Sequence, residues 1–244
     1  MHDFFGAVIG VEKNFFSFII PYISIISLTF LIIKFRDRLK NYRYEKILRY
    51  SFIVFMIILE VIFHIWTYVY LAKYSLTSYL FEYSMIPFHV CALSLWLIII
   101  IGFNKSQKLF KFTFFISIMG PLLTIFGGSV DFSYDRFRYW HFYQEHINTF
   151  ILAIYMMYVH DLKIEKGDWL KAFQVLAVLA VILALPLNIF LGTDFMYIYN
   201  YAHSPFEIIS NKVLALIAAI ILVVVFFRLI EYIFVDLKSK RKHR

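Results

Sequence analysis

Long apolar stretches alternate with short polar connections along the whole chain. A helix needs about 20 consecutive, mostly apolar residues to cross the hydrocarbon core of a membrane. Seven stretches of roughly this length occur, at residues 15–35, 50–72, 86–103, 112–128, 142–161, 172–191 and 210–234. The pattern predicts an all-α membrane protein whose residues 1–244 form a single domain of seven transmembrane helices.

The composition agrees with this pattern and excludes several other classes. The chain is 62% hydrophobic and only 16% charged, whereas soluble domains are about half apolar and about a quarter charged. A single cysteine excludes a disulfide framework and any cysteine-rich zinc module. The short connections leave no room for a separate soluble domain.

The distribution of Lys and Arg predicts the orientation in the membrane, because cytoplasmic connections carry an excess of these residues. Alternate connections, at 34–49, 105–111 and 163–171, together with the tail at 238–244, hold 18 of the 24 basic residues. We therefore expect an extracytoplasmic N-terminus and a cytoplasmic C-terminus, in a multi-pass protein of a cell membrane. The net charge of +8 then matches a basic face beside anionic lipid and requires no nucleic-acid partner.

Ionisable and amide side chains inside a membrane span are costly, so they mark candidate functional positions. Several lie in the predicted spans, near the ends that face outward in this topology. They are Glu60, His64, His89, Cys91, Glu145, His146 and Asn148. We expect them to converge in one polar layer open to the extracytoplasmic side, while the inner halves of the spans stay apolar.

Spacing along a helix predicts which of these side chains can meet. Glu60 and His64 are four residues apart and share a helical face, so we expect a hydrogen-bonded pair. His89 and Cys91 are two residues apart, about 200° around a regular helix, so they face different surroundings unless Pro87 distorts the turn. We expect His141, which follows two aromatic residues, to lie at the headgroup level.

Cys91 and His146 form a candidate nucleophile and base, because their predicted depths in the membrane match to within a turn. Glu145, Glu60 or Asn148 could orient the imidazole or donate to an oxyanion. The residues also allow a zinc site built across helices from His64, His89, His146 and Glu60. A third possibility is a proton or cation path through Glu60, His64 and Glu145, although no internal repeat supports a transporter.

The spacing Pro-x-His-x-Cys-x-x-Ser occurs here as Pro87, His89, Cys91 and Ser94. It resembles the Leu-Pro-x-His-x-Cys-x-x-Ser signature of the bacterial YwaF family of integral membrane proteins. The resemblance covers most of the chain, with seven spans in the same order.

Two further segments carry this resemblance. Residues 192–197 are similar to that family's Gly-x-Asn-Tyr-Met-Tyr segment, from which they depart at Asp194 and Phe195. The segment Gln144-Glu145-His146 matches the family's histidine at the start of a long span.

The YwaF family in turn looks like the vertebrate transmembrane protein 164 group, described as acyltransferases that move fatty acyl chains between phospholipids. The resemblance implies that Cys91 is the nucleophile, that His146 is its partner, and that membrane phospholipids are substrates. It implies no cofactor, no metal and a location in the bacterial cytoplasmic membrane. The alternatives are a zinc-dependent lipid hydrolase and a transporter or lipid-binding protein.

Overall fold

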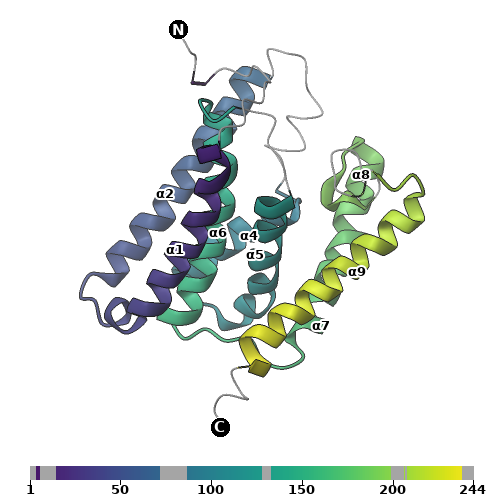
Figure 1. Cartoon of the computed structure of the whole chain (residues 1–244). Coiled ribbons are helices and arrows are strands. Elements are labelled where there is room, and N and C mark those ends of the chain that lie inside the picture. Colours follow the sequence, from purple (N-terminus) through teal and green to yellow (C-terminus); the bar gives the residue numbers. More distant parts are fainter. Residues whose placement is uncertain are drawn as a thin grey trace.

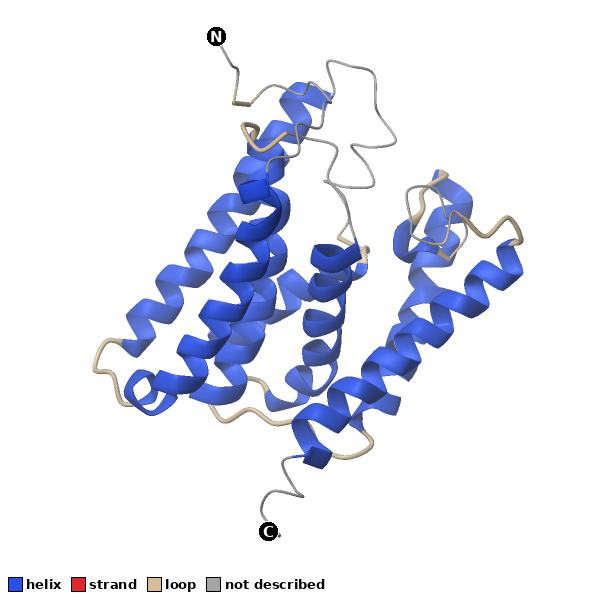
Figure 2. Ribbon diagram, viewed as in Figure 1, coloured by secondary structure: helices blue, strands red, loops and turns tan. Residues whose placement is uncertain are grey.

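The computed structural model describes residues 4–5, 15–71, 87–127, 133–198, 206 and 208–237. Within these ranges every regular element is a helix and no strand occurs (Figure 2). The predicted all-α class is therefore confirmed for the described chain. The predicted span ends at 72, 86 and 128 and the basic tail at 238–244 lie outside the described residues.

The helices follow the predicted spans in order. They are α1 (Phe15–Lys40), α2 (Glu45–Trp66), η1 (Thr67–Leu71), α4 (Val90–Asn104), α5 (Gln107–Gly127), α6 (Phe137–Val159), α7 (Asp168–Leu179), η3 (Ala180–Ala184), α8 (Leu185–Leu191), η4 (Phe195–Tyr197), α9 (Lys212–Glu231) and η5 (Tyr232–Asp236).

Among the described residues, five helical segments are long and apolar enough to cross a membrane. They are Ile19–Lys40, Glu45–Val69, Gln107–Phe126, Asp168–Leu191 and Lys212–Asp236. Helix α4 is apolar but has only 15 residues, and α6 is not among the five. A multi-pass membrane protein is thus supported, whereas the seventh crossing and the orientation of the ends stay predictions.

The helices form two groups that meet at α5 (Figure 1). Helices α1, α2 and α6 lie side by side, α4 and α5 pack against α6, and α7 to α9 flank α5 on the other side. In α5, 61% of the span is buried inside the protein, against 17% in α1. Phenylalanine rings join α5 to the last helix, with centroids 5.2 Å apart for Phe115 and Phe227. Helix α5 is therefore the centre of the bundle.

The start of α2 and the ends of α4 and α6 hold a polar network, in the halves of these spans that the sequence analysis expected to be purely apolar. Helix α2 begins at Glu45 rather than at residue 50, so Arg49 belongs to the helix and is only 3% exposed. The Glu45 carboxylate accepts hydrogen bonds from Arg49 (2.8 Å), Tyr155 (3.0 Å) and His160 (2.7 Å). Arg49 also donates to the carbonyl of Gly102. The charged guanidinium of Arg49 can be buried because its N–H groups donate to the Glu45 carboxylate and to the Gly102 carbonyl.

The segment between α7 and α9 is shaped by Pro186 and Gly192. The π-helical turn η3 directly precedes α8, where Pro186 lacks the N–H that a regular helix would use. Helix α8 ends at Gly192, whose φ of 69° lies in the left-handed region that glycine adopts without strain. The chain then turns back toward the start of α4.

Candidate active site

Cys91 is the second residue of α4, at the end of the bundle where that helix begins. Helix formation upstream is disfavoured because Pro87 restricts the residue before it, and His89 is the extended N-cap, with φ −66° and ψ 143°. The backbone N–H groups of the first turn have no acceptor within the helix. The Cys91 side chain, which is half-buried, thus stands in the first turn of α4.

His146 lies within hydrogen-bonding reach of the Cys91 thiol, so the structure brings together the expected nucleophile and base. The Nδ1 atom of His146 is 2.6 Å from the carbonyl oxygen of Phe142, one turn earlier in α6. A carbonyl oxygen only accepts, so Nδ1 carries the proton and donates it. In the neutral ring Nε2 therefore keeps its lone pair for the thiol proton.

Helix α5 contacts the sulfur through Gly120 and Thr124. A Cβ atom at Gly120 would lie 3.2 Å from the Cys91 sulfur, which is closer than most Cβ contacts. One turn further, the Thr124 hydroxyl is 3.7 Å from the same sulfur. The Gly120-Pro121 pair, which interrupts the fourth apolar stretch, thus leaves room beside Cys91.

Glu60 and His141 form a buried pair that links α2 to α6. The Nε2 atom of His141 is 3.0 Å from the Glu60 carboxylate, and its Nδ1 atom is 3.0 Å from the Arg138 guanidinium. Arg138 has no acceptor atom, so Nδ1 accepts and Nε2–H donates to Glu60. The guanidinium also stands 4.6 Å from the centroid of the Phe63 ring. Arg138, His141 and Glu60 thus form one directed chain of hydrogen bonds.

The structure adds to the sequence expectations for this chain of hydrogen bonds. His141 is only 2% exposed, because a carboxylate on a neighbouring helix satisfies its N–H; its position at the headgroup level stays a prediction. His64 does not pair with the Glu60 carboxylate; its Nδ1 donates to the Glu60 backbone carbonyl at 2.7 Å. Glu60 and His64 do share a helical face, as their spacing predicts, but the Glu60 carboxylate is hydrogen-bonded to His141 instead of His64.

Two further residues that were expected in the site, Glu145 and Asn148, lie on the same helix as His146. Glu145 is half-buried, interacts electrostatically with His141 and His146, and has no hydrogen bond to its carboxylate among the described residues. Asn148 is 5% exposed, and its amide nitrogen has no partner in the described part of the chain. It is therefore an available buried donor on the helix that carries His146.

His89 faces away from Cys91 and contacts the segment after α8. Its Nε2 atom is 3.7 Å from the Asp194 carboxylate, and its ring lies 5.3 Å from the ring of Phe195. The 200° separation expected on a regular helix does not apply, because α4 begins only after His89. His89 and Cys91 nevertheless contact different parts of the protein, as expected: His89 contacts Asp194 and Phe195, whereas Cys91 contacts Thr124.

The contact surface for His89 is fixed by the fully buried Asn188. Its side-chain oxygen accepts from the Thr193 hydroxyl (2.9 Å) and the Phe195 N–H (2.8 Å), and its nitrogen donates to the Phe195 carbonyl (3.0 Å). Two consecutive residues that follow, Met196 and Tyr197, have φ of 57° and 51°. The hydrogen bonds of Asn188 hold this strained turn against the start of α4.

One set of described residues has the spacing of a metal site. Single ligand atoms of Glu60, His141 and Glu145 lie within 4.8 Å of one another. This set shares only Glu60 with the zinc site considered from the sequence. In the observed hydrogen-bond pattern neither nitrogen of His141 has a free lone pair, so a metal would have to displace the Nε2 proton and the Arg138 contact.

Sequence reasoning missed Arg138 and Thr124, and it placed His141 and Asn188 among the polar residues of the predicted spans without giving them a role in the site. His141 lies four residues before Glu145 and seven before Asn148, so helical spacing was a usable signal for it. No comparable signal existed for Thr124, whose role depends on a contact between helices.

The model of the TMEM164 family matches residues 9–230 of the chain. Neither the comparison with curated proteins nor that with solved structures gave a match. The expected relation to the transmembrane protein 164 group is thereby confirmed over most of the chain.

Proposed function

The chain belongs to the TMEM164 family, and from this premise we propose that it is a membrane acyltransferase that carries a fatty acyl chain on Cys91. The observation that carries the proposal is the placement of the single thiol at the start of α4, within hydrogen-bonding reach of the His146 ring, whose Nδ1 is bonded to the Phe142 carbonyl. A thiol beside an imidazole and a helix N-terminus is an activated nucleophile.

The first half-reaction forms a thioester. His146 Nε2 takes the proton of the Cys91 thiol, and the thiolate attacks the carbonyl carbon of a phospholipid ester. The tetrahedral oxyanion collapses, the ester C–O bond breaks, and the lysolipid alkoxide leaves with the proton from His146. The buried amide nitrogen of Asn148 and the free N–H groups at the start of α4 are the candidate oxyanion donors.

The second half-reaction returns the enzyme to its starting state. An acceptor hydroxyl of a lysolipid, or an amine of a lipoprotein, gives its proton to His146 and attacks the thioester. The C–S bond breaks, the acyl chain passes to the acceptor, and the thiolate recovers the proton. One histidine acts first as base and then as acid in each half-reaction.

We further propose that the chain is a YwaF-type member that crosses the bacterial cytoplasmic membrane seven times. The Pro87-x-His89-x-Cys91 spacing supports the first point, and the 18 basic residues in alternate connections and the tail support the second. In this orientation Cys91 acts near the outer leaflet.

Intact mass spectrometry of the purified chain tests the covalent mechanism. Incubation with phospholipid should add one fatty acyl mass, and hydroxylamine should remove it because thioesters are cleaved under those conditions. Cys91→Ala should not be loaded, while Cys91→Ser is the matched control that keeps the size of the side chain. Transfer of acyl chains by Cys91→Ala at the wild-type rate would exclude a thioester.

Metal-assisted hydrolysis is a second candidate, favoured only by the close spacing of Glu60, His141 and Glu145. A bound divalent ion would polarise the ester carbonyl or activate water. Metal analysis of the purified chain distinguishes the two functions. Stoichiometric metal whose removal by a chelator abolishes lipid cleavage, without any acyl mass on Cys91, would favour the metal.

A further inference from the structure

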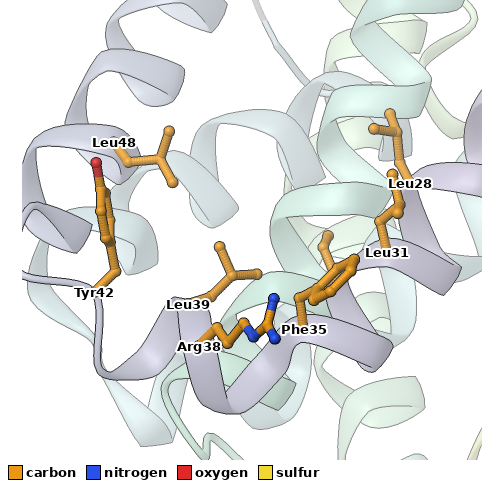
Figure 3. A pocket seen from close by; sticks show the side chains of 8 residues that line it. Leu28, Leu31, Phe35, Arg38, Leu39, Tyr42 and Leu48 are labelled. Atoms are coloured by element: carbon orange, nitrogen blue, oxygen red, sulfur yellow. The ribbon is translucent and has the colours of Figure 1, made fainter.

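A groove lies where the end of α1 meets the start of α2, at the opposite end of the bundle from Cys91 (Figure 3). It has a volume of about 410 Å³, and its walls are almost entirely apolar. Leu28, Leu31 and Leu48 are between 40% and 46% exposed, so no described part of the protein covers them. The guanidinium of Arg38 stands 5.5 Å from the centroid of the Phe35 ring, between the side chains of Leu28 and Leu31 and those of Tyr42 and Leu48 (Figure 3).

The part of the groove between Leu28 and Arg38 matches the thickness of one leaflet of a membrane. Leu28 and Arg38 are ten residues apart on α1, which corresponds to about 15 Å at 1.5 Å per residue. The hydrocarbon core of a bilayer is about 30 Å thick, so one leaflet contributes about 15 Å. If Leu28 lies near the middle of the membrane, Arg38 lies at the level of the lipid phosphates.

The charge of Arg38 is not compensated by a carboxylate within the described part of the chain, unlike the charges of Arg36 and Lys40. Lys40 is bonded to Asp161, and this contact holds the pKa of the Asp161 carboxyl below its ordinary value. Arg36 lies 3.5 Å from the Asp37 carboxylate. Arg38 has no carboxylate partner among the described residues, so the apolar groove contains one uncompensated cation.

We propose that this groove binds an anionic phospholipid, with the phosphate on Arg38 and one acyl chain along Leu28 and Leu31. A guanidinium presents a planar pair of donors that fits two phosphate oxygens. Basic pockets between transmembrane helices are known sites for anionic headgroups. A choline headgroup would place a second cation beside Arg38, so the site discriminates against phosphatidylcholine. The proposal does not depend on the chemistry of Cys91.

Native mass spectrometry of the full chain, titrated with phosphatidylglycerol or phosphatidylcholine, measures this preference. The wild type should retain phosphatidylglycerol more tightly. Arg38→Gln should weaken its binding about fivefold, the effect of one basic residue near a membrane surface, and should leave phosphatidylcholine unchanged. Arg36→Gln removes the same charge from the same helix and should have no effect, because Asp37 already compensates Arg36.

A second variant tests the acyl-chain part of the site. Leu31→Trp fills the groove from its exposed side and keeps Arg38, so it should release phosphatidylglycerol without changing the thermal stability of the core. Equal losses in Arg38→Gln and Arg36→Gln would show diffuse surface charge and overturn the proposal. Full phosphatidylglycerol binding in Leu31→Trp, or equal affinity of the wild type for both lipids, would also overturn it.

Discussion

Two histidines near the proposed site have the same tautomer, with the proton on Nδ1. His64 and His146 each donate Nδ1–H to the backbone carbonyl four residues earlier, at 2.7 Å and 2.6 Å. This contact fixes the tautomer and directs Nε2 away from the helix. His141 has the reverse arrangement, since Arg138 is bonded to its Nδ1. The local backbone thus selects which imidazole can act as a base.

We predict that His146→Ala slows acyl loading of Cys91 by about 10²-fold or more, because general-base catalysis typically contributes 10² to 10⁴. Alkylation by iodoacetamide gives a second measurement that needs no lipid. Since Cys91 is the only thiol, its rate is read directly from the mass of the chain. His160→Ala, at the other end of the same helix, should leave the alkylation rate unchanged. An unchanged alkylation rate in His146→Ala would show that His146 does not activate the Cys91 thiol.

Glu60 and Glu145 provide a matched pair of carboxylates. Glu60→Ala leaves the His141 N–H without an acceptor and the Arg138 charge without its link, so we predict a loss of about 1–3 kcal/mol in stability. Glu145→Ala removes a half-buried carboxylate that no hydrogen bond holds among the described residues, and should cost less. Thermal unfolding in detergent compares the two variants. Equal destabilisation would argue against a structural role specific to the Arg138–His141–Glu60 chain.

At this scale the sequence predicted the meeting of Cys91 and His146, because depth in the membrane depends only on position along each span. It could not predict the partner of Glu60. Two residues on adjacent helices meet through helix rotation and register, which apolar spans leave open. His141 follows Tyr139 and Trp140, a composition typical of the membrane interface, and its burial depends on Glu60 across the helix pair.

Among the elements, the segment from Gly192 to Tyr197 links the second group of helices to the start of α4. Its strained residues are held by Asn188 on one side and contact His89 on the other. Left-handed φ values in residues other than glycine cost of order 1 kcal/mol or more and persist only when their surroundings enforce them. This segment therefore positions the residue two before the proposed nucleophile.

We predict that Asn188→Ala, which removes three hydrogen bonds, destabilises the protein by about 3 kcal/mol at roughly 1 kcal/mol per bond. Thr193→Val removes one of these bonds at nearly constant volume and should cost about a third as much. Thr193→Ser keeps the hydroxyl and serves as the control. Thermal unfolding gives the order of the three variants. The scheme fails if Asn188→Ala and Thr193→Val are equally stable.

Helix order could be predicted from the sequence, but the helix ends could not. The second span was expected from residue 50, since Lys46 and Arg49 look like parts of a connection. In the structure α2 starts at Glu45, because Glu45 and Arg49 are one turn apart and satisfy each other. An ion pair at i, i+4 lets charged residues continue a helix that composition alone would end.

For the whole molecule, the predicted orientation has a direct test. Figure 1 shows that α1 begins at one end of the bundle and α9 ends at the other. A tag fused at Met1 should be labelled on intact cells, and a tag at Arg244 only after permeabilisation, because the basic connections favour the cytoplasm. Labelling of both tags from the same side would require an even number of crossings.

The number of membrane crossings is harder to predict than the helical fold, because the length and hydropathy of a helix do not by themselves decide whether it crosses the membrane. Helix α4 has 15 residues and rises about 22 Å, less than the hydrocarbon thickness. It packs against α5 and α6 instead of standing alone in lipid. Short or polar helices can therefore be held at membrane depth by their neighbours, which a hydropathy criterion does not take into account.

The group that orients His146 is a peptide carbonyl, and this has a consequence for genetics. Every amino acid at position 142 supplies the same oxygen, so no codon change that preserves the helix can delete the third member of the proposed triad. A saturation screen would find Cys91 and His146 and report a dyad. Only backbone chemistry, such as replacing the following amide by an ester to weaken that carbonyl as an acceptor, would reveal the contribution of Phe142.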